Sequence, residues 1–206
     1  YKINQLHLYI EHTFLFDGLS EVWRDDTPLT AQDILEFDAY CAERNIELVP
    51  SVATFGHLYK VLRTKTFHEL SEVEEAEGTA CSFYERMCHH TLNSTDDRAY
   101  ELVCRLIDEY SPLFRSNLFN INCDETFDLG RGRGKERADE IGSHVMYVQW
   151  VNRVCEHVKA LGKRPMFWGD IIAAHPEAIK ELPEDVICMT WDYSPTPREI
   201  NVKKLW

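Results

Sequence analysis

Five short apolar runs recur along the chain, each separated from the next by a longer segment. They lie at residues 6–10, 46–49, 118–122, 165–168 and 186–190. Short runs that are apolar nearly throughout are typical of strands buried on both faces, as in parallel sheets. The pattern therefore predicts five parallel strands.

Helical spacing of apolar residues fills the segments between these runs. Thr30 and Asp33 form a capping box that predicts a helix start, and Ser94 with Asp97 predicts a second one. A third helical face runs from about residue 143 to Gly162, a residue suited to a left-handed C-terminal cap. The irregular segment from 54 to about 93 is too long for an idle connection and predicts a functional loop or lid.

Strands that alternate with helices define an α/β protein, either a doubly wound sheet or a (β/α) barrel. The polar residues at the strand ends separate the two, because a barrel brings many strand ends to one mouth and a doubly wound sheet has one switch point. Polar and aromatic residues follow all five runs, at Glu11-His12, His57, Asp124-Glu125, Trp168-Gly169-Asp170 and Trp191-Asp192-Tyr193. This distribution favours the barrel.

The composition is that of an ordinary globular protein, with 206 residues, 44% of them hydrophobic and 12% aromatic. The formal net charge of −13 argues against nucleic acid or an anionic membrane as a partner. No apolar run approaches the ~20 residues of a membrane span.

Seven cysteines are scattered along the chain without a Cys-x-x-Cys pair. This arrangement favours buried free thiols in a reducing compartment over a disulfide framework. The chain opens on Tyr1, and no signal peptide is visible. We therefore expect a cytoplasmic location, and export of a longer protein stays open.

The pair Asp124-Glu125 directly follows the third apolar run, and aromatic residues follow the neighbouring runs. Flat aromatic faces beside carboxylates suit a sugar, whose C–H faces stack on rings while an acid protonates the glycosidic oxygen. The strand ends thus predict a carbohydrate site.

These residues resemble glycoside hydrolase family 20, the β-N-acetylhexosaminidases. The segment Asn122-Cys123-Asp124-Glu125-Thr126 is similar to the Gly-x-Asp-Glu signature on the family's fourth barrel strand. The flanking motifs match in order, with residues 4–9 resembling the second strand, Val49-Pro50 with Gly56-His57 the third, residues 167–170 the fifth and residues 191–193 the sixth. The resemblance implies a (β/α)8 barrel of which the whole chain, residues 1–206, supplies about strands 2 to 6 of one partial catalytic domain.

The resemblance implies an exo-acting hydrolase that removes terminal β-linked N-acetylglucosamine or N-acetylgalactosamine with retention and without a cofactor. Glu125 would be the general acid and later the base. Asp124 would hold the substrate's 2-acetamido group, whose carbonyl oxygen attacks the anomeric carbon to give an oxazolinium intermediate.

The other site residues follow from the same resemblance. His57 with Glu11 behind it would tune the pKa of the acid. Contacts to the sugar are expected from Trp168, Asp170, Trp191, Tyr193 and His12.

Alternative interpretations stay open. The first strand, with its sugar-binding Arg, and the seventh and eighth strands have no match here. We expect them from the rest of the protein or from another subunit, and we expect little turnover from the chain alone. A truncated or degenerate barrel would bind amino sugars without cleaving them.

Three further patterns point to other chemistry. A metal-dependent barrel hydrolase would use His7, His12, His57 and Asp170, but His7 and His12 lie on opposite faces of a strand. A zinc site at Cys81 and Cys88-His89-His90 lacks a second spaced pair. The segment Gly130-Arg131-Gly132-Arg133-Gly134-Lys135 fits no phosphate-loop spacing, and a flexible basic loop at the mouth is expected.

Overall fold

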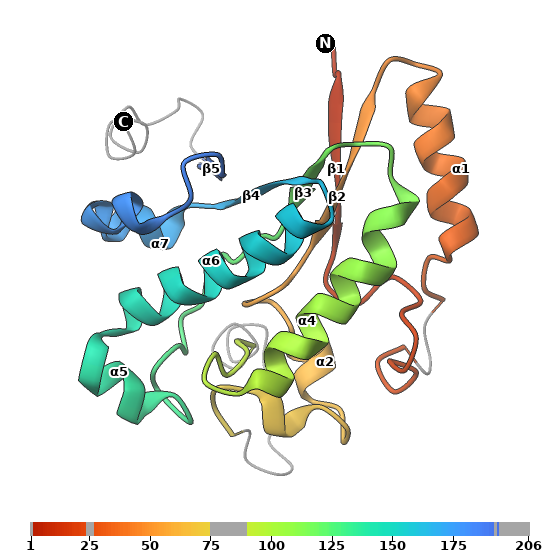
Figure 1. Cartoon of the computed structure of the whole chain (residues 1–206). Helices are drawn as coiled ribbons and strands as arrows, with labels where there is room; N and C mark the ends of the chain where they lie inside the picture. Colours follow the sequence, from red (N-terminus) through yellow and green to blue (C-terminus); the bar gives the residue numbers. More distant parts are fainter. Residues whose placement is uncertain (1, 24–26, 75–89, 192, 194–206) are drawn as a thin grey trace.

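Five parallel strands form the centre of the molecule in the computed structural model, which describes residues 2–23, 27–74, 90–191 and 193 (Figure 1). The strands are β1 (Gln5–Ile10), β2 (Glu47–Val52), β3 (Leu118–Asn120), β4 (Arg164–Trp168) and β5 (Ile187–Met189). Each predicted run overlaps one of them, so the strand predictions are confirmed, with β2 extending further and β3 ending earlier than the apolar pattern indicates.

The strand order is β1-β2-β3-β4-β5, and every neighbouring pair is parallel. A doubly wound sheet reverses its order at a switch point, whereas a (β/α) barrel adds each strand beside the previous one. The sheet is therefore an arc of a (β/α) barrel, as predicted.

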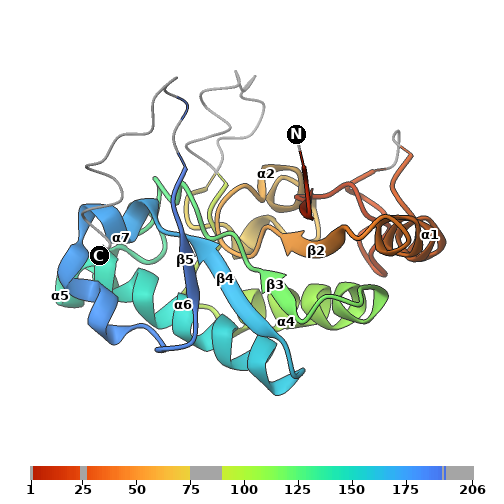
Figure 2. The same cartoon turned by 90° about the horizontal axis from the view of Figure 1, so that it is seen from above.

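Helices alternate with the strands. They are α1 (Ala31–Ala42), α2 (Tyr59–Leu62), α4 (Asp97–Tyr110), α5 (Lys135–Ile141), α6 (Ser143–Ala160) and α7 (Asp170–Ala174), with 3-10 turns at His68–Leu70, Ser111–Leu113 and Pro176–Glu181. Helices α4 and α6 lie along one face of the sheet (Figure 2). None of the helices in the described ranges is long and apolar enough to cross a membrane.

The helix starts test the capping predictions. The Thr30 capping box is confirmed, because the Asp33 carboxylate accepts the Thr30 N–H at 2.8 Å and Thr30 Oγ1 accepts the Asp33 N–H at 3.2 Å. The start at Ser94 is wrong, because Asp96 caps α4. Asn93 Oδ1 accepts the Thr95 N–H at 3.1 Å, which holds the chain in a turn for two more residues.

The two faces of the sheet differ in chemistry. Five strand residues on the face toward the helices are apolar and at most 2% exposed, namely Ile10, Leu48, Val52, Phe119 and Phe167. Burial of each such side chain stabilises the fold by roughly 1.5–3 kcal/mol. On the opposite face, the register aligns Tyr9, Ser51, Asn120, Met166 and Ile187 across all five strands. The barrel interior is thus partly polar.

The long segment predicted as a loop or lid contains α2 and the 3-10 turn at His68–Leu70. Its residues 75–89, including Cys81, Cys88 and His89 of the zinc pattern, lie outside the described residues. The five cysteines within the described ranges are free thiols.

Candidate active site

The backbone enters the left-handed region of φ shortly after β3 ends. Asn122, Cys123 and Glu125 all have left-handed φ angles, of 58°, 63° and 52°, which side chains other than glycine seldom adopt. The segment after β2 presses against this turn, because a Cβ added to Gly56 would lie 2.3 Å from the Asp124 carbonyl oxygen. These constraints end the predicted strand early and direct two adjacent carboxylates into the mouth.

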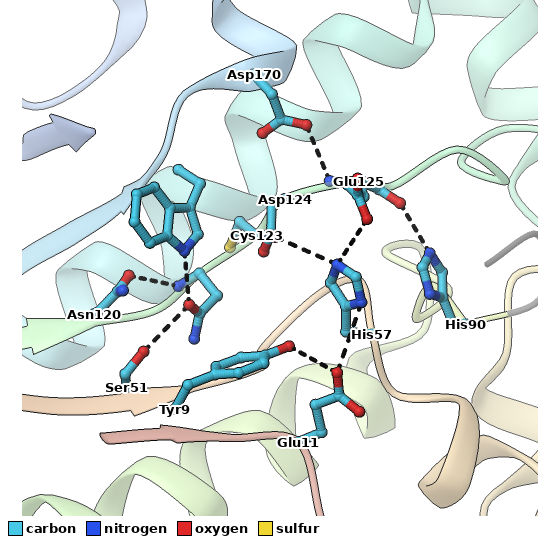
Figure 3. Close-up of polar contacts among 12 residues, drawn as sticks. Tyr9, Glu11, Ser51, His57, His90, Asn120, Cys123, Asp124, Glu125 and Asp170 are labelled. Carbon is cyan, nitrogen blue, oxygen red and sulfur yellow. Dashed lines mark hydrogen bonds and ion pairs between the residues drawn. The ribbon is translucent and has the colours of Figure 1, made fainter. Parts of the chain in front are cut away.

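His57 lies between the carboxylates that follow β3 and the one that follows β1 (Figure 3). Its Nε2 is 3.3 Å from Asp124 Oδ2 and 3.2 Å from Glu125 Oε2, and its Nδ1 is 3.8 Å from Glu11 Oε1. The structure therefore brings together the four residues predicted as the catalytic pair and its relay.

Burial and neighbouring charges shift the pKa values of Glu125 and His57, the two titratable groups at the centre of this cluster. Burial raises the pKa of Glu125, the His57 cation lowers it, and the Asp124 charge raises it, which leaves it above its usual value. Burial lowers the pKa of His57, but the hydrogen bond to Asp124 and the charges of Asp124, Glu11 and Glu125 outweigh that effect and leave the pKa raised. A carboxyl with a raised pKa beside an imidazole that can exchange a proton suits general acid catalysis near neutral pH.

The oxygen of Asp124 that does not face His57 lacks a partner among the residues that the structure describes. Asp124 Oδ1 is buried and accepts no hydrogen bond from any described residue. A buried carboxylate oxygen without a donor is costly, and an amide N–H entering the mouth would satisfy it.

Glu11 is held by two neighbours. Tyr9 donates its hydroxyl to Glu11 Oε1 at 3.1 Å, and His12 Nδ1 lies 3.9 Å from Glu11 Oε2. His12 thus lies next to the carboxylate of the relay, and its predicted contact with the sugar stays a prediction.

Trp168 is oriented by a polar chain across the barrel interior. Its Nε1–H donates to Asn122 Oδ1 at 3.0 Å, and the Ser51 hydroxyl donates to the same oxygen at 3.2 Å. Asn122 stands at a position that is often glycine in the family motif, and Asn tolerates left-handed backbone better than most residues. Its role, like that of Ser51 and Tyr9, is not visible in the local sequence.

Asp170 binds the backbone of the catalytic pair. Its Oδ2 accepts the Glu125 N–H at 3.0 Å. Burial raises the pKa of Asp170 to about 6, with the Glu125 N–H opposing the shift and the Asp124 charge adding to it. The carboxyl predicted to contact the sugar thus has one oxygen engaged within the protein.

Trp191 and Tyr193 follow β5 and pair with each other, with ring centroids 5.5 Å apart. Trp191 is 38% exposed and Tyr193 93% exposed. Their predicted sugar contacts stay predictions.

The glycine-rich segment after β3 wraps an internal carboxylate. The N–H groups of Gly130, Gly132 and Gly134 donate to Glu72 Oε1 at 3.1, 3.1 and 2.9 Å. This segment, predicted as a flexible loop, is thus anchored, and it resembles an anion-binding nest occupied by a side chain of its own chain.

Parallel βα units with an acidic cluster at the carboxyl ends of the strands define a catalytic (β/α)-barrel domain. The profile of glycosyl hydrolase family 20, catalytic domain, matches residues 18–204. The chain belongs to this family.

Individual relatives agree with this assignment. Hexosaminidase D of Homo sapiens is 26% identical over 200 residues, which cover 93% of this chain and 39% of that protein. The β-N-acetylhexosaminidase of Bacteroides fragilis superposes with a TM-score of 0.74 at 18% identity and covers 98% of this chain and 42% of its own. A mutant Streptomyces plicatus β-hexosaminidase in complex with GlcNAc superposes with a TM-score of 0.67 at 20% identity and covers 98% and 38%. The chain therefore spans about two fifths of each of these proteins.

Proposed function

We propose that the protein containing this chain is an exo-acting β-N-acetylhexosaminidase that works by substrate assistance. The observation that carries the proposal is the shared histidine, because Asp124 and Glu125 both approach His57 Nε2 within 3.3 Å. Two carboxylates on one side of a site cannot flank an anomeric carbon as acid and nucleophile. The substrate's own acetamido oxygen then supplies the nucleophile.

Each group of the cluster takes a role that suits its surroundings. Glu125, with its raised pKa, protonates the leaving oxygen and later removes a proton from the attacking water. Asp124 accepts the acetamido N–H on its buried Oδ1, which has no donor in the described part of the chain, and stabilises the oxazolinium cation by its charge. The GlcNAc in the Streptomyces plicatus complex is the product that such a reaction releases.

The metal-dependent alternative finds no support in the described ranges, where no group of three or more His, Cys, Asp or Glu side chains is placed to hold a metal ion. A truncated or degenerate barrel that only binds amino sugars would make the same contacts with the sugar but would not cleave it. Hydrolysis by the full-length protein separates binding from cleavage.

The test uses the full-length protein with two substrates, 4-nitrophenyl N-acetyl-β-glucosaminide and a β-linked disaccharide of N-acetylglucosamine. We expect release of the terminal sugar, first as the β anomer by NMR. Glu125→Gln should lower kcat by about 10²–10⁴-fold on the disaccharide. The loss should be smaller on the nitrophenyl substrate, whose leaving group needs less protonation.

Glu136→Gln is the matched control, because Glu136 is an exposed residue in the first turn of α5. It should keep full activity. Activity of Glu125→Gln within twofold of wild type on the disaccharide would remove Glu125 from the role of acid. If the wild type binds N-acetylglucosamine but hydrolyses neither substrate, the proposed hydrolase function is rejected and the amino-sugar binding interpretation is supported.

A further inference from the structure

The backbone of Glu125 is held on both sides of its Cα atom. Its φ of 52° is unfavourable for a residue with a Cβ and persists only where the surroundings over-determine it. The N–H donates to Asp170 Oδ2 at 3.0 Å, and the carbonyl oxygen lies 2.8 Å from His90 Nε2. The two contacts fix the two peptide groups that flank the side chain of the acid (Figure 3).

His90 comes from a different part of the chain and is 2% exposed. Asp128 Oδ2 accepts the N–H groups of His90 and Thr91, each at 3.1 Å, and Asp128 Oδ1 accepts the Thr91 hydroxyl. The His90 carbonyl oxygen accepts the Leu58 N–H at 3.0 Å. His90 is therefore tied both to the loop after β3 and to the residue that follows His57.

The protonation state of His90 follows from its partners. A carbonyl oxygen only accepts, so Nε2 carries the proton in the bond to Glu125. Burial lowers the pKa of His90, and the adjacent His57 also lowers it, against the opposing effects of the Glu125 carbonyl, Asp128 and Glu11. This lowered pKa favours the neutral form of the ring, which lies against His57 with the centroids 4.9 Å apart.

We infer that His90 is a positioning residue of this site. Its imidazole holds the Glu125 carbonyl while Asp170 holds the N–H, and its ring packs against that of His57. The inference rests on the proposed function for its effect on rate, whereas the restraint on the backbone is independent of catalysis. Nothing in the Cys88-His89-His90 sequence indicates this role.

The experiment compares His90→Phe with His90→Gln in the full-length protein. Phe keeps a planar ring but removes the donor, and the Gln amide can place an N–H near the position of Nε2. We expect His90→Phe to lower kcat about tenfold or more, because small displacements of a catalytic group are costly, with KM within twofold. His90→Gln should recover most of the rate.

His68→Phe is the matched control, because His68 Nδ1 also pairs with a backbone carbonyl, that of Lys65 at 2.9 Å, but outside the site. It should leave kcat unchanged. A kcat of His90→Phe within twofold of wild type would overturn the inference. An equal loss in both His90 variants, accompanied by a matching fall in melting temperature, would also overturn it.

A second measurement is independent of turnover. Amide hydrogen exchange at Glu125, whose N–H binds Asp170, should be several-fold faster in His90→Phe than in wild type or His68→Phe. An unchanged exchange rate at Glu125 in His90→Phe would refute the restraint of the Glu125 backbone by His90, even if the variant stays active. Absence of hydrolysis by the wild type would count against the proposed function, and the exchange rates would still decide the role of His90.

Discussion

Carboxylates with restricted exposure contact both ends of the loop after β3, and the protein surrounds them differently. Beyond the loop, Glu72 is 0% exposed and accepts three backbone N–H groups on one oxygen. At its start, Asp124 and Glu125 face one imidazole. Burial raises the pKa of both Glu72 and Glu125, so the shift alone does not separate the two sites.

The kind of partner separates them. Backbone N–H groups cannot titrate and hardly move, so they fix the Glu72 carboxylate as a tie between two loops. His57 can exchange a proton, whereas the N–H groups around Glu72 cannot. Each carboxylate also keeps one buried oxygen without a donor among the described residues, Asp124 Oδ1 and Glu72 Oε2, so the titratable neighbour is what separates the two sites. A carboxylate with fixed donors suits architecture, and one with a titratable neighbour suits chemistry.

Asp124→Ala should show the largest effect of the comparison. Loss of the charge that stabilises the oxazolinium cation should lower kcat by about 10²–10³-fold, the range for one electrostatic contact in an active site. A thiazoline that mimics the intermediate should bind correspondingly more weakly. Unchanged thiazoline affinity would reject the assigned role, and a melting temperature near that of wild type would show that the loss is chemical.

Glu72→Ala should produce the opposite profile. Three N–H groups, one in a buried and two in partly buried bonds, would lose their acceptor. We expect this loss to lower the free energy of unfolding by about 3 kcal/mol, measured by urea denaturation of the full-length protein. kcat of the folded fraction should stay within a few-fold of wild type. If Glu72→Ala lowers kcat more than it lowers the free energy of unfolding, the distinction between a structural carboxylate at Glu72 and a catalytic one at Asp124 fails.

Glu72→Gln is the control for charge, because its amide oxygen can accept the same three bonds. It should recover most of the lost stability. The pKa of Glu72 in the folded protein lies above its ordinary value of 4.5. Wild type should therefore gain stability relative to Glu72→Gln as the pH falls through the folded pKa toward 4.5.

Two glycines allow the same substitution on each side of the comparison. A Cβ at Gly56 would lie 2.3 Å from the Asp124 carbonyl oxygen, and one at Gly132 would lie 2.0 Å from the Glu72 carbonyl oxygen. Each Ala variant should cost about 2 kcal/mol through overpacking. Gly56→Ala should also lower kcat, whereas Gly132→Ala should not, and equal kcat values for the two variants would contradict this expectation.

Glu11→Gln should have the smallest effect. A charge about 4 Å away in water-like surroundings contributes about 1 kcal/mol, or roughly a fivefold change in rate. Because the Glu11 charge raises the pKa of His57, its loss should lower that pKa, as followed by NMR titration of the imidazole. Tyr9→Phe, which removes only the hydroxyl bond to Glu11, should leave the His57 titration closer to wild type.

The fold follows from the sequence because its signals are local. Apolar runs of strand length and the Thr30 capping box need no knowledge of distant residues. The start of α4 was misplaced because Asn93 forms a turn with Thr95 that competes with the Ser94 pattern. The early end of β3 reflects contact with Gly56, which the apolar pattern of residues 118–122 does not contain.

The candidate site is only partly predictable for the same reason. Glu11, His57, Asp124 and Glu125 are chemically conspicuous at strand ends, and they meet. His90, Asn122 and Asp128 act through contacts between segments distant in the sequence, and their residue types are common in ordinary loops. The same limit applies to the glycine-rich segment, whose partner Glu72 is about 60 residues away.

The placement of the tryptophans gives the protein an internal optical probe. Trp23 and Trp150 are 7% and 2% exposed, and both indoles donate to backbone carbonyls. Trp168, bonded to Asn122 beside Asp124, and the half-exposed Trp191 stand at strand ends of the mouth. From the predicted sugar contacts of Trp168 and Trp191, we expect a bound sugar to change the emission of the second pair and to leave that of the first pair constant, so intrinsic fluorescence would report occupancy without a label.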